Sequence, residues 1–280
     1  MMVRLFAVDL DGTLLDRTGK VHERDREALH AIAKTGVAVS IVTGRLFSGT
    51  RVAASLIGAH GPVGCVDGSH IVEAASGRDL VHHGIEPRDA ELLRAAIVEH
   101  GAACFVFAHD EIVYDARGES FLPYVRTWSL EVVRSERATS HPHWEHERGL
   151  SEVVCVGDGE TIRGAADAID ARLGGRVQTV SFAIRRPELG GLWGMVVRAA
   201  GTNKGTALRW LAEHHACAME ETVVVGDWLN DLPMFAVAGR SFAMGQAPEG
   251  VKRAATDELV ATHESGGGIL EAARRLGILP

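Results

Sequence analysis

The chain has 280 residues, which is enough for one large domain or two modest ones. Hydrophobic residues make up 46% and charged residues 24%, which is ordinary for a folded globular protein and excludes disorder as the default. The formal net charge is −8 and no long basic run is present, so nucleic acid and anionic membrane surfaces are not expected as main partners.

The first part of the chain alternates apolar runs with helical patterns. Residues 3–8 (VRLFAV) form a short apolar run that ends at Asp9, which is typical of a strand buried on both faces of a parallel sheet. Apolar spacing over residues 22–35 predicts a helix. A second apolar run, 37–42, predicts another strand, and a helix is expected to follow to about Ile57. This alternation is the pattern of a doubly wound α/β sheet.

The middle of the chain has a different order of predicted helices and strands. In chain order it predicts a helix, a hairpin, a strand with a helix, and two further strands, at residues 87–100, 103–114, 152–173, 176–186 and 192–198. We therefore expect an α+β domain inserted at residues 83–189. Residues 1–82 and 190–280 then form the α/β core.

The last part of the chain returns to the first pattern. Residues 203–215 carry apolar side chains at helical spacing, and residues 222–226 (TVVVG) are another buried-strand run. A short strand near 240–244 and a terminal helix near 268–276 complete the predicted core.

Three of the apolar runs end in polar clusters. The clusters occupy residues 9–13, 43–45 and 226–227. Because ligands of open parallel sheets bind beyond the carboxyl ends of the strands, we expect these clusters to meet at one edge. That edge would collect Asp9, Asp11 and Asp227. Three neighbouring carboxylates require raised pKa values or a cation, and Mg²⁺ is a cation that prefers oxygen ligands.

The same edge offers groups that suit an anion. Thr43 has a hydroxyl donor and Gly44 leaves its backbone amide bare. Lys204 lies at the predicted start of a helix, with Thr202 as the expected N-cap, and a helix N-terminus with a lysine attracts anions. Carboxylates with a cation opposite these donors suit a phosphoryl group, whose transfer depends on positioning and charge stabilisation.

These stretches resemble, in order, the four motifs of the haloacid dehalogenase superfamily. VDLDGTLL at 8–15 resembles the first motif in its phosphatase form, and Thr43 after its apolar run resembles the second. Lys204 in NKGTAL resembles the third, and GDWLNDLPMF at 226–235 the fourth. The insertion has the length and pattern of the Cof-type cap. The resemblance covers nearly the whole chain and is weakest inside the insertion; four motifs in order are strongly specific.

The resemblance implies a role for each matching residue. Asp9 would be the nucleophile and Asp11 the general acid/base. The Asp9 carboxylate, the Asp11 backbone carbonyl and Asp227 would hold Mg²⁺. Gly12, Thr43, Gly44 and Lys204 would bind the phosphate, and Asn230 and Asp231 would order the metal's waters or Lys204. Arg45 either contacts substrate or pairs with an acid.

Two positions depart from the family pattern. The family often has Asn-Gly where this chain has Asp67-Gly68, and often Asn where it has Gln246. Neither position carries the chemical step, so the departures concern local substrate contacts.

The motifs predict a Mg²⁺-dependent phosphatase that acts on a small phosphorylated metabolite, such as a sugar phosphate or a phosphorylated cofactor. The alternative is a phosphotransferase or phosphomutase that uses the same Asp nucleophile. A non-catalytic binding protein is disfavoured because every expected chemical group is present. Dehalogenation is disfavoured because Asp11 belongs to the phosphatase pattern.

The histidines of HPHWEH leave another alternative open. His141, His143 and His146 suggest a transition metal, because imidazole binds zinc well. However, Pro142 indicates a loop, no cysteine lies nearby in sequence, and the spacing matches no common structural zinc site. A polar loop is therefore the favoured interpretation.

The remaining features concern location and partners. The four cysteines lie far apart without a C-x-x-C pair, which fits a reducing compartment. Asp9 and Asp11 interrupt the N-terminal apolar run too early for a signal peptide, and no stretch of about 20 apolar residues occurs. We expect a cytoplasmic protein, a monomer or weak homodimer, whose partner is a small-molecule phosphate ester.

Overall fold

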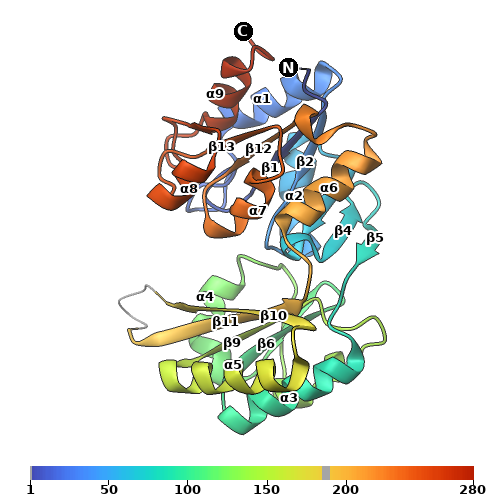
Figure 1. Cartoon of the computed structure of the whole chain (residues 1–280), viewed down its shortest axis with the longest axis vertical. Coiled ribbons are helices and arrows are strands. Elements are labelled where there is room, and N and C mark those ends of the chain that lie inside the picture. Colours follow the sequence, from blue (N-terminus) through green and yellow to red (C-terminus); the bar gives the residue numbers. More distant parts are fainter. Residues whose placement is uncertain (1, 185–189) are drawn as a thin grey trace. The chain divides into compact units, whose positions relative to one another are not determined.

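The computed structural model describes residues 2–184 and 190–280, which fall into two compact units (Figure 1). The first unit comprises Met1–Val81 and Asn203–Pro280, and the second comprises His82–Thr202. The expected end of the insertion, residue 189, lies outside the described residues. The expected core segment 190–280 begins too early, because a strand at Leu192–Ala199 pairs within the sheet of the second unit.

The first unit is built on a parallel sheet of five strands in the order β14-β13-β12-β1-β2. The strands are β1 (Leu5–Val8), β2 (Ala38–Ile41), β12 (Thr222–Gly226), β13 (Arg240–Ala243) and β14 (Asp257–Glu258). Every residue of β1 and β12 is buried, as the apolar runs predicted for strands covered on both faces. The predicted parallel α/β fold is confirmed.

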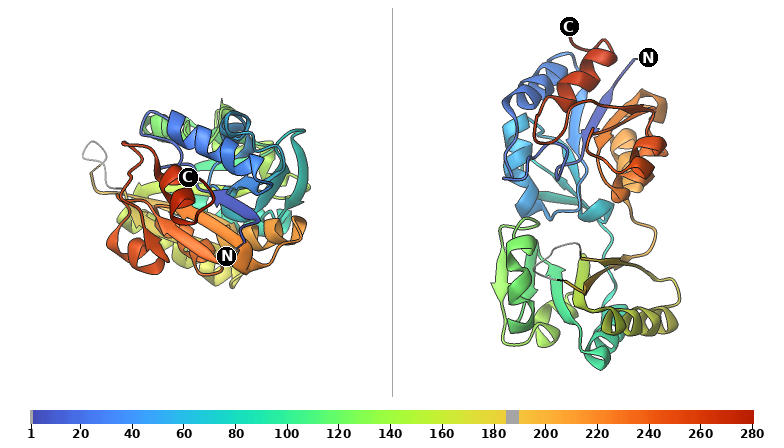
Figure 2. Two further views of the ribbon diagram at one scale, coloured as in Figure 1. Left: turned by 90° about the horizontal axis from the view of Figure 1, so that it is seen from above. Right: turned by 90° about the vertical axis from the view of Figure 1, so that its left-hand side faces the viewer.

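Helices cover both faces of this sheet. They are α1 (Glu23–Lys34), α2 (Phe47–Ile57), α6 (Lys204–His214), α7 (Leu232–Phe235), α8 (Glu249–Ala254) and α9 (Gly268–Arg275). Helix α1 packs on α2 and α9, whereas α6 packs on α7. Figure 2 shows α1 and α2 (blue) on one face of the sheet and α6 and α7 (orange) on the other.

A small three-stranded sheet that was not among the predicted elements follows α2, and its first two strands are antiparallel. Its strands are β3 (Pro62–Cys65), β4 (His70–Glu73) and β5 (Arg78–His82). A bridge between Val42 and Gly64 joins β3 to the end of β2. The 3₁₀ turn η1 (Val66–Gly68) then carries Asp67, whose φ is +48°. This arrangement brings Asp67 close to the strand ends of the main sheet.

The second unit holds a six-stranded sheet in the order β10-β11-β9-β6-β7-β8, antiparallel except for β7 with β8. The strands are β6 (Ala103–Ala108), β7 (Glu111–Tyr114), β8 (Val132–Arg134), β9 (Glu152–Asp158), β10 (Val177–Ala183) and β11 (Leu192–Ala199). Of the strand expected at 176–186, residues 185 and 186 lie outside the described residues.

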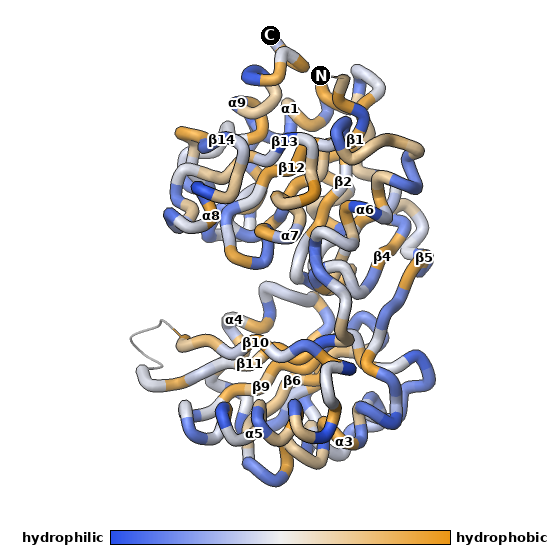
Figure 3. The backbone as a smooth tube through the Cα atoms, viewed as in Figure 1, coloured by the Kyte–Doolittle hydropathy of each residue, from blue (hydrophilic) through white to orange (hydrophobic). Residues whose placement is uncertain are grey.

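Helices α3 (Pro87–His100) and α5 (Gly159–Leu173) pack on each other and on one face of this sheet. Shorter helical turns include α4 (Leu122–Val125), η2 (Ala116–Phe121), η3 (Ala138–Ser140) and η4 (Pro142–Glu145). Figure 3 shows hydrophobic residues concentrated in the strands of both units. The α+β pattern expected for the middle of the chain is therefore observed.

All four cysteines are free thiols, and Cys65, Cys104 and Cys155 are buried. Among residues 2–184 and 190–280, no helix combines the length and the apolar character that a membrane span requires.

Candidate active site

The first unit brings Asp9 and Asp227 together at the ends of neighbouring strands. Val8 and Val225 are partners in the parallel pairing of β1 with β12, and the backbone amide of Asp9 donates to the Val225 carbonyl at 3.0 Å. Both aspartates are largely buried. The strands thus end at the same edge of the sheet, as the position of the polar clusters predicted.

Lys204 lies between buried carboxylates. It is the first residue of α6 and only 1% exposed. Its Nζ lies 2.6 Å from Asp9 Oδ1 and 2.6 Å from Asp231 Oδ1. A buried ammonium with two charged acceptors is the arrangement that makes burial of a lysine tolerable.

The expected N-cap of this helix was wrong by one residue. Asn203, not Thr202, caps α6, because its side chain accepts hydrogen bonds from the amides of Gly205 and Thr206. The Thr202 hydroxyl instead donates to the Ala199 carbonyl. The cap fixes the first turn of α6 and hence the direction in which Lys204 leaves it.

Asp231 holds the loop that follows β12. Its Oδ2 accepts hydrogen bonds from the amides of Asp227 at 2.8 Å and Trp228 at 2.9 Å, while Oδ1 accepts from Lys204. A Cβ on Gly226 would lie 2.5 Å from the Asp231 carboxyl carbon, so glycine is required at the strand end. Asp231 therefore connects the loop to Lys204.

The charges of the site are strongly coupled. Burial raises the pKa of Asp9 well above its usual range, although Lys204 opposes this. Burial, helped by the charge of Asp231, raises the pKa of Asp227 to about 7. Burial alone would lower the pKa of Lys204, but Asp231 and Asp9 outweigh it and the net shift is upward. More negative charge is gathered here than one lysine neutralises, which favours a cation.

The carboxylate oxygens have room for such a cation. Asp9, Asp227 and Asp231 each place one oxygen within 4.8 Å of the others. Asp227 Oδ1 is buried and has no hydrogen-bond partner among the described residues. Both oxygens of Asp231 already accept hydrogen bonds, so Asp9 and Asp227 have the better-placed free lone pairs. This donor set fits Mg²⁺, which is usually bound by one or two carboxylates.

Asp11 forms an ion pair with Arg45. The guanidinium donates from Nε to Oδ2 at 2.7 Å and from Nη2 to Oδ1 at 2.5 Å. The Arg45 side chain is 12% exposed and that of Asp11 51%. Of the two alternatives for Arg45, the structure shows pairing with an acid. A two-point contact fixes the orientation of the Asp11 carboxylate while leaving it open to solvent.

The expected phosphate-binding residues line the same edge. Thr43 is buried, and its hydroxyl accepts a hydrogen bond from the Arg45 amide at 3.2 Å. Gly12 has φ +81°, and a Cβ there would lie 2.3 Å from Asp227 Oδ2. A Cβ on Gly44 would lie 3.3 Å from Asp67 Oδ1. The missing side chains at Gly12 and Gly44 therefore allow carboxylates to approach the backbone closely.

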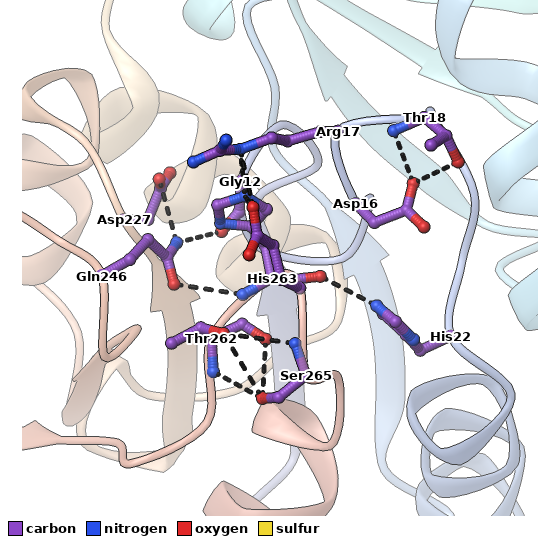
Figure 4. Close-up of polar contacts among 11 residues, drawn as sticks. Gly12, Asp16, Arg17, Thr18, His22, Asp227, Gln246, Thr262, His263 and Ser265 are labelled. Carbon is purple, nitrogen blue, oxygen red and sulfur yellow. Dashed lines mark hydrogen bonds and ion pairs between the residues drawn. The ribbon is translucent and has the colours of Figure 1, made fainter.

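The sequence predicted only local substrate contacts for Asp67 and Gln246, but both side chains bond to residues of the site. The Asn230 side-chain amide donates to Asp67 Oδ1 at 2.9 Å, and Asp67 adds to the charges that raise the pKa of Lys204. Gln246 Nε2 donates to the Gly12 carbonyl at 2.5 Å and lies 3.3 Å from Asp227 Oδ2 (Figure 4). Both positions depart from the family pattern, and that departure was the available signal.

Gln246 also connects the site to a loop near the C-terminus. Its Oε1 accepts a hydrogen bond from the His263 amide at 3.1 Å, and the His263 carbonyl lies 2.8 Å from His22 Nε2 (Figure 4). The loop is closed by hydrogen bonds between Thr262 and Ser265. Gln246 thus has a fixed orientation toward Gly12 and Asp227.

The family model for haloacid dehalogenase-like hydrolases matches residues 6–272. The chain belongs to this family. A phosphoglycolate phosphatase from Archaeoglobus fulgidus is 27% identical over 276 residues, with 99% of this chain and 98% of the relative covered. An HMP-PP phosphatase from Cronobacter sakazakii is 26% identical over 249 residues, with 88% and 85% covered.

Solved structures agree on the fold. A haloacid dehalogenase-like hydrolase from Bacteroides thetaiotaomicron superimposes with a TM-score of 0.83 at 22% identity, covering 98% of this chain and 99% of the other. A subclass IIB sugar phosphatase of the same superfamily gives 0.77 at 20% identity, covering 99% and 100%. The family match and the curated relatives together identify this chain as a Cof-type enzyme of the phosphatase kind.

Proposed function

We propose that this haloacid dehalogenase-like hydrolase is a Mg²⁺-dependent phosphatase that hydrolyses small phosphorylated metabolites through an aspartyl-phosphate on Asp9. The observation that carries the proposal is the buried Lys204, bonded to Asp9 and Asp231, next to Asp227, whose Oδ1 has no partner in the described part of the chain. This arrangement supplies an oriented nucleophile, a positive charge and a place for a cation within one small volume.

In the first step, a carboxylate oxygen of Asp9 attacks phosphorus and the ester oxygen leaves. Lys204 holds Asp9 through Oδ1, which leaves Oδ2 for the attack or for the cation. Mg²⁺, when bound by Asp9, the Asp11 carbonyl and Asp227, would stabilise the negative charge of the phosphoryl group. Thr43 and the amides of Gly12 and Gly44 would orient the remaining phosphoryl oxygens.

Asp11 would act in both halves of the reaction. It would give a proton to the leaving oxygen, and then take a proton from the water that attacks the phosphoryl group on Asp9. Hydrolysis releases inorganic phosphate and restores the Asp9 carboxylate. The contact with Arg45 would orient the Asp11 side chain for these proton transfers.

Substrate selection is a separate part of the proposal. The relatives are named for phosphoglycolate and HMP-PP, and one structural neighbour is a sugar phosphatase. We assign to this chain the shared class, small phosphate esters of metabolites. The residues assigned to the site in the first unit would contact only the phosphoryl group, so we assign discrimination among esters to the inserted second unit.

Phosphate release from a broad panel of phosphorylated metabolites tests the proposal. The wild type should release phosphate with Mg²⁺ and not with a chelator, and Asp9→Asn should be at least about 10⁴-fold slower. Release that survives chelation or the Asp9 change would contradict the mechanism. An isomerised ester with little free phosphate would instead identify a phosphotransferase that uses the same nucleophile.

A further inference from the structure

The side-chain amide of Gln246 is fixed in one orientation by the backbone of His263. The His263 amide donates to Gln246 Oε1 at 3.1 Å, so the other end of the amide, Nε2, faces the metal site (Figure 4). There Nε2 donates to the Gly12 carbonyl and lies 3.3 Å from Asp227 Oδ2. The reversed amide would turn an oxygen, which cannot donate, toward these two acceptors. The His263 amide therefore decides which end of Gln246 faces Gly12 and Asp227.

This orientation distinguishes the two carboxylate oxygens of Asp227. Oδ2 lies against Gln246, whereas the buried Oδ1 has no hydrogen-bond partner in the described part of the chain. A hydrogen bond to one oxygen of a ligating carboxylate fixes its rotation, and such contacts contribute to metal affinity. The Gln246 contact thus leaves Oδ1 as the oxygen available to a cation.

His263 is itself held by His22. His263 belongs to the segment between β14 and α9, residues 259–267, which we call the C-terminal loop. His22 Nε2 lies 2.8 Å from the His263 carbonyl, and because a carbonyl only accepts, Nε2 carries the proton. A Cβ on Gly266 would lie 2.4 Å from His22 Cγ, so the C-terminal loop packs directly on the imidazole ring. The amide and the carbonyl of His263 therefore connect Gln246 with His22.

The position of His22 in its helix indicates that its side chain serves the C-terminal loop. His22 is the N-cap of α1, where Ser, Thr, Asp or Asn usually accepts from the first amides of the helix, but the His22 side chain makes no such bond. Asp25, which is 1% exposed, also turns away from α1 and accepts from the amides of Gly267 and Ile269. The first turn of α1 therefore holds the C-terminal loop at two points.

We propose that His22 is a positioning residue for the Mg²⁺ site, a role that rests on the phosphatase function proposed above. It acts through the backbone of His263 and the side chain of Gln246 on Asp227. His22 is not a ligand, and three contacts in series separate it from the Asp227 carboxylate. Its removal should therefore weaken Mg²⁺ binding less than removal of Gln246 does.

Calorimetric titration of the chelator-treated full-length protein with Mg²⁺, at one pH, tests this role without an activity assay. We expect His22→Leu to bind Mg²⁺ about 3-fold to 10-fold more weakly than the wild type. His22→Gln should restore the affinity, because its amide nitrogen can donate to the His263 carbonyl in place of the imidazole. An unchanged affinity in His22→Leu, or an equal loss in His22→Gln, would overturn the proposal.

A second histidine of α1 provides the matched control. His30 Nε2 lies 2.9 Å from the Leu56 carbonyl in α2, so His30→Leu removes the same kind of hydrogen bond elsewhere. His30→Leu should bind Mg²⁺ as the wild type does. A loss in His30→Leu equal to that in His22→Leu would assign the effect to general destabilisation and contradict the proposal.

A double variant tests whether His22 acts through Gln246. His22→Leu combined with Gln246→Ala should bind Mg²⁺ no more weakly than Gln246→Ala alone, because the path is already broken. Losses that add would contradict the proposed path. Phosphate release separates this outcome from the function itself: a wild type that binds Mg²⁺ but cleaves no ester contradicts the phosphatase, whereas normal Mg²⁺ binding in His22→Leu contradicts only the role of His22.

Discussion

At the scale of single residues, Lys204 balances most of the charge in the site. Its Nζ contacts two buried carboxylates at 2.6 Å, and Asp67 contributes a third negative charge. Removing one partner from a buried ion pair leaves the other charges without compensation, which usually costs more than the pair itself contributes. Lys204 should therefore matter for folding as well as for phosphate binding.

Lys204→Met should lower the free energy of unfolding of the metal-free protein by about 3–5 kcal/mol near neutral pH. Urea denaturation with and without Mg²⁺ measures this, and Mg²⁺ should restore part of the loss because it replaces the missing positive charge. Lys252→Met is the matched control, since Lys252 pairs with the solvent-exposed Glu258 and should change stability much less. Equal stability of the two variants would contradict the charge balance described above.

The pKa of Asp227 predicts how Mg²⁺ binding depends on pH. Because burial raises this pKa to about 7, the carboxyl is protonated below that pH and must lose its proton to bind a cation. Mg²⁺ affinity should therefore fall as pH decreases through about 7, by up to about tenfold per pH unit. Calorimetric titrations at several pH values measure this, and an affinity that does not change with pH would contradict the assignment of Asp227 as a ligand.

Gln246 should tune the metal site without taking part in the chemistry. Gln246→Ala removes the donor that holds Gly12 and Asp227, so the Mg²⁺ concentration for half-maximal activity should rise about 10-fold to 100-fold. Gln178→Ala, at an exposed position of β10, is the matched control. An unchanged Mg²⁺ requirement in Gln246→Ala would show that the contact is only structural.

The sequence allowed the central residues to be predicted, but not their supporting contacts. Asp9 and Asp227 directly follow apolar runs, and Lys204 is the first residue of a helix. Residues at such positions lie near the same edge of a parallel sheet. The roles of Asp67 and Gln246 depend on side-chain distances across the fold. No local pattern encodes those distances.

At the scale of elements, the end of β12 depends on a glycine. Gly226→Ala would place a Cβ 2.5 Å from the Asp231 carboxyl carbon and push that side chain away from the amides it holds. We expect a loss of about 1–3 kcal/mol in stability, together with most of the activity. Gly250→Ala is the matched control, because a Cβ in α8 meets nothing within 4 Å. Thermal melting and an activity assay compare the two variants, and normal activity in Gly226→Ala would contradict the role given to Asp231.

The sequence predicted the strands correctly where burial on both faces produces a continuous apolar run. Strands β1 and β12 are buried throughout and mostly apolar because helices cover both faces of their sheet. The sequence did not predict the small sheet β3–β5, because its strands are short and lack a regular alternation of apolar and polar residues. Strand β3 also contains Pro62 and Gly64, which are uncommon in strands. The cap of α6 was misplaced by one residue because Thr202 and Asn203 are both good N-caps, and only the hydrogen bonds distinguish them.

At the scale of the whole molecule, the residues assigned to the reaction lie outside the inserted second unit. Every residue assigned to the chemical step lies in Met1–Val81 or Asn203–Pro280, and none lies in His82–Thr202. The sequence predicted the end of the insertion at residue 189, which is too early, because β11 is an apolar run that resembles the strands of the core. Its antiparallel register with β9 and β10, which the local sequence does not reveal, assigns it to the second unit.

The most direct test of the central claim is to trap the phosphorylated enzyme. An active ester with labelled phosphate is mixed with the wild type and Mg²⁺, quenched with acid during turnover, and the protein is digested and analysed by mass. We predict labelled phosphate on the peptide that contains Asp9, and none in Asp9→Asn. Turnover with no protein-bound phosphate at any time, or label on another residue, would contradict Asp9 as the nucleophile.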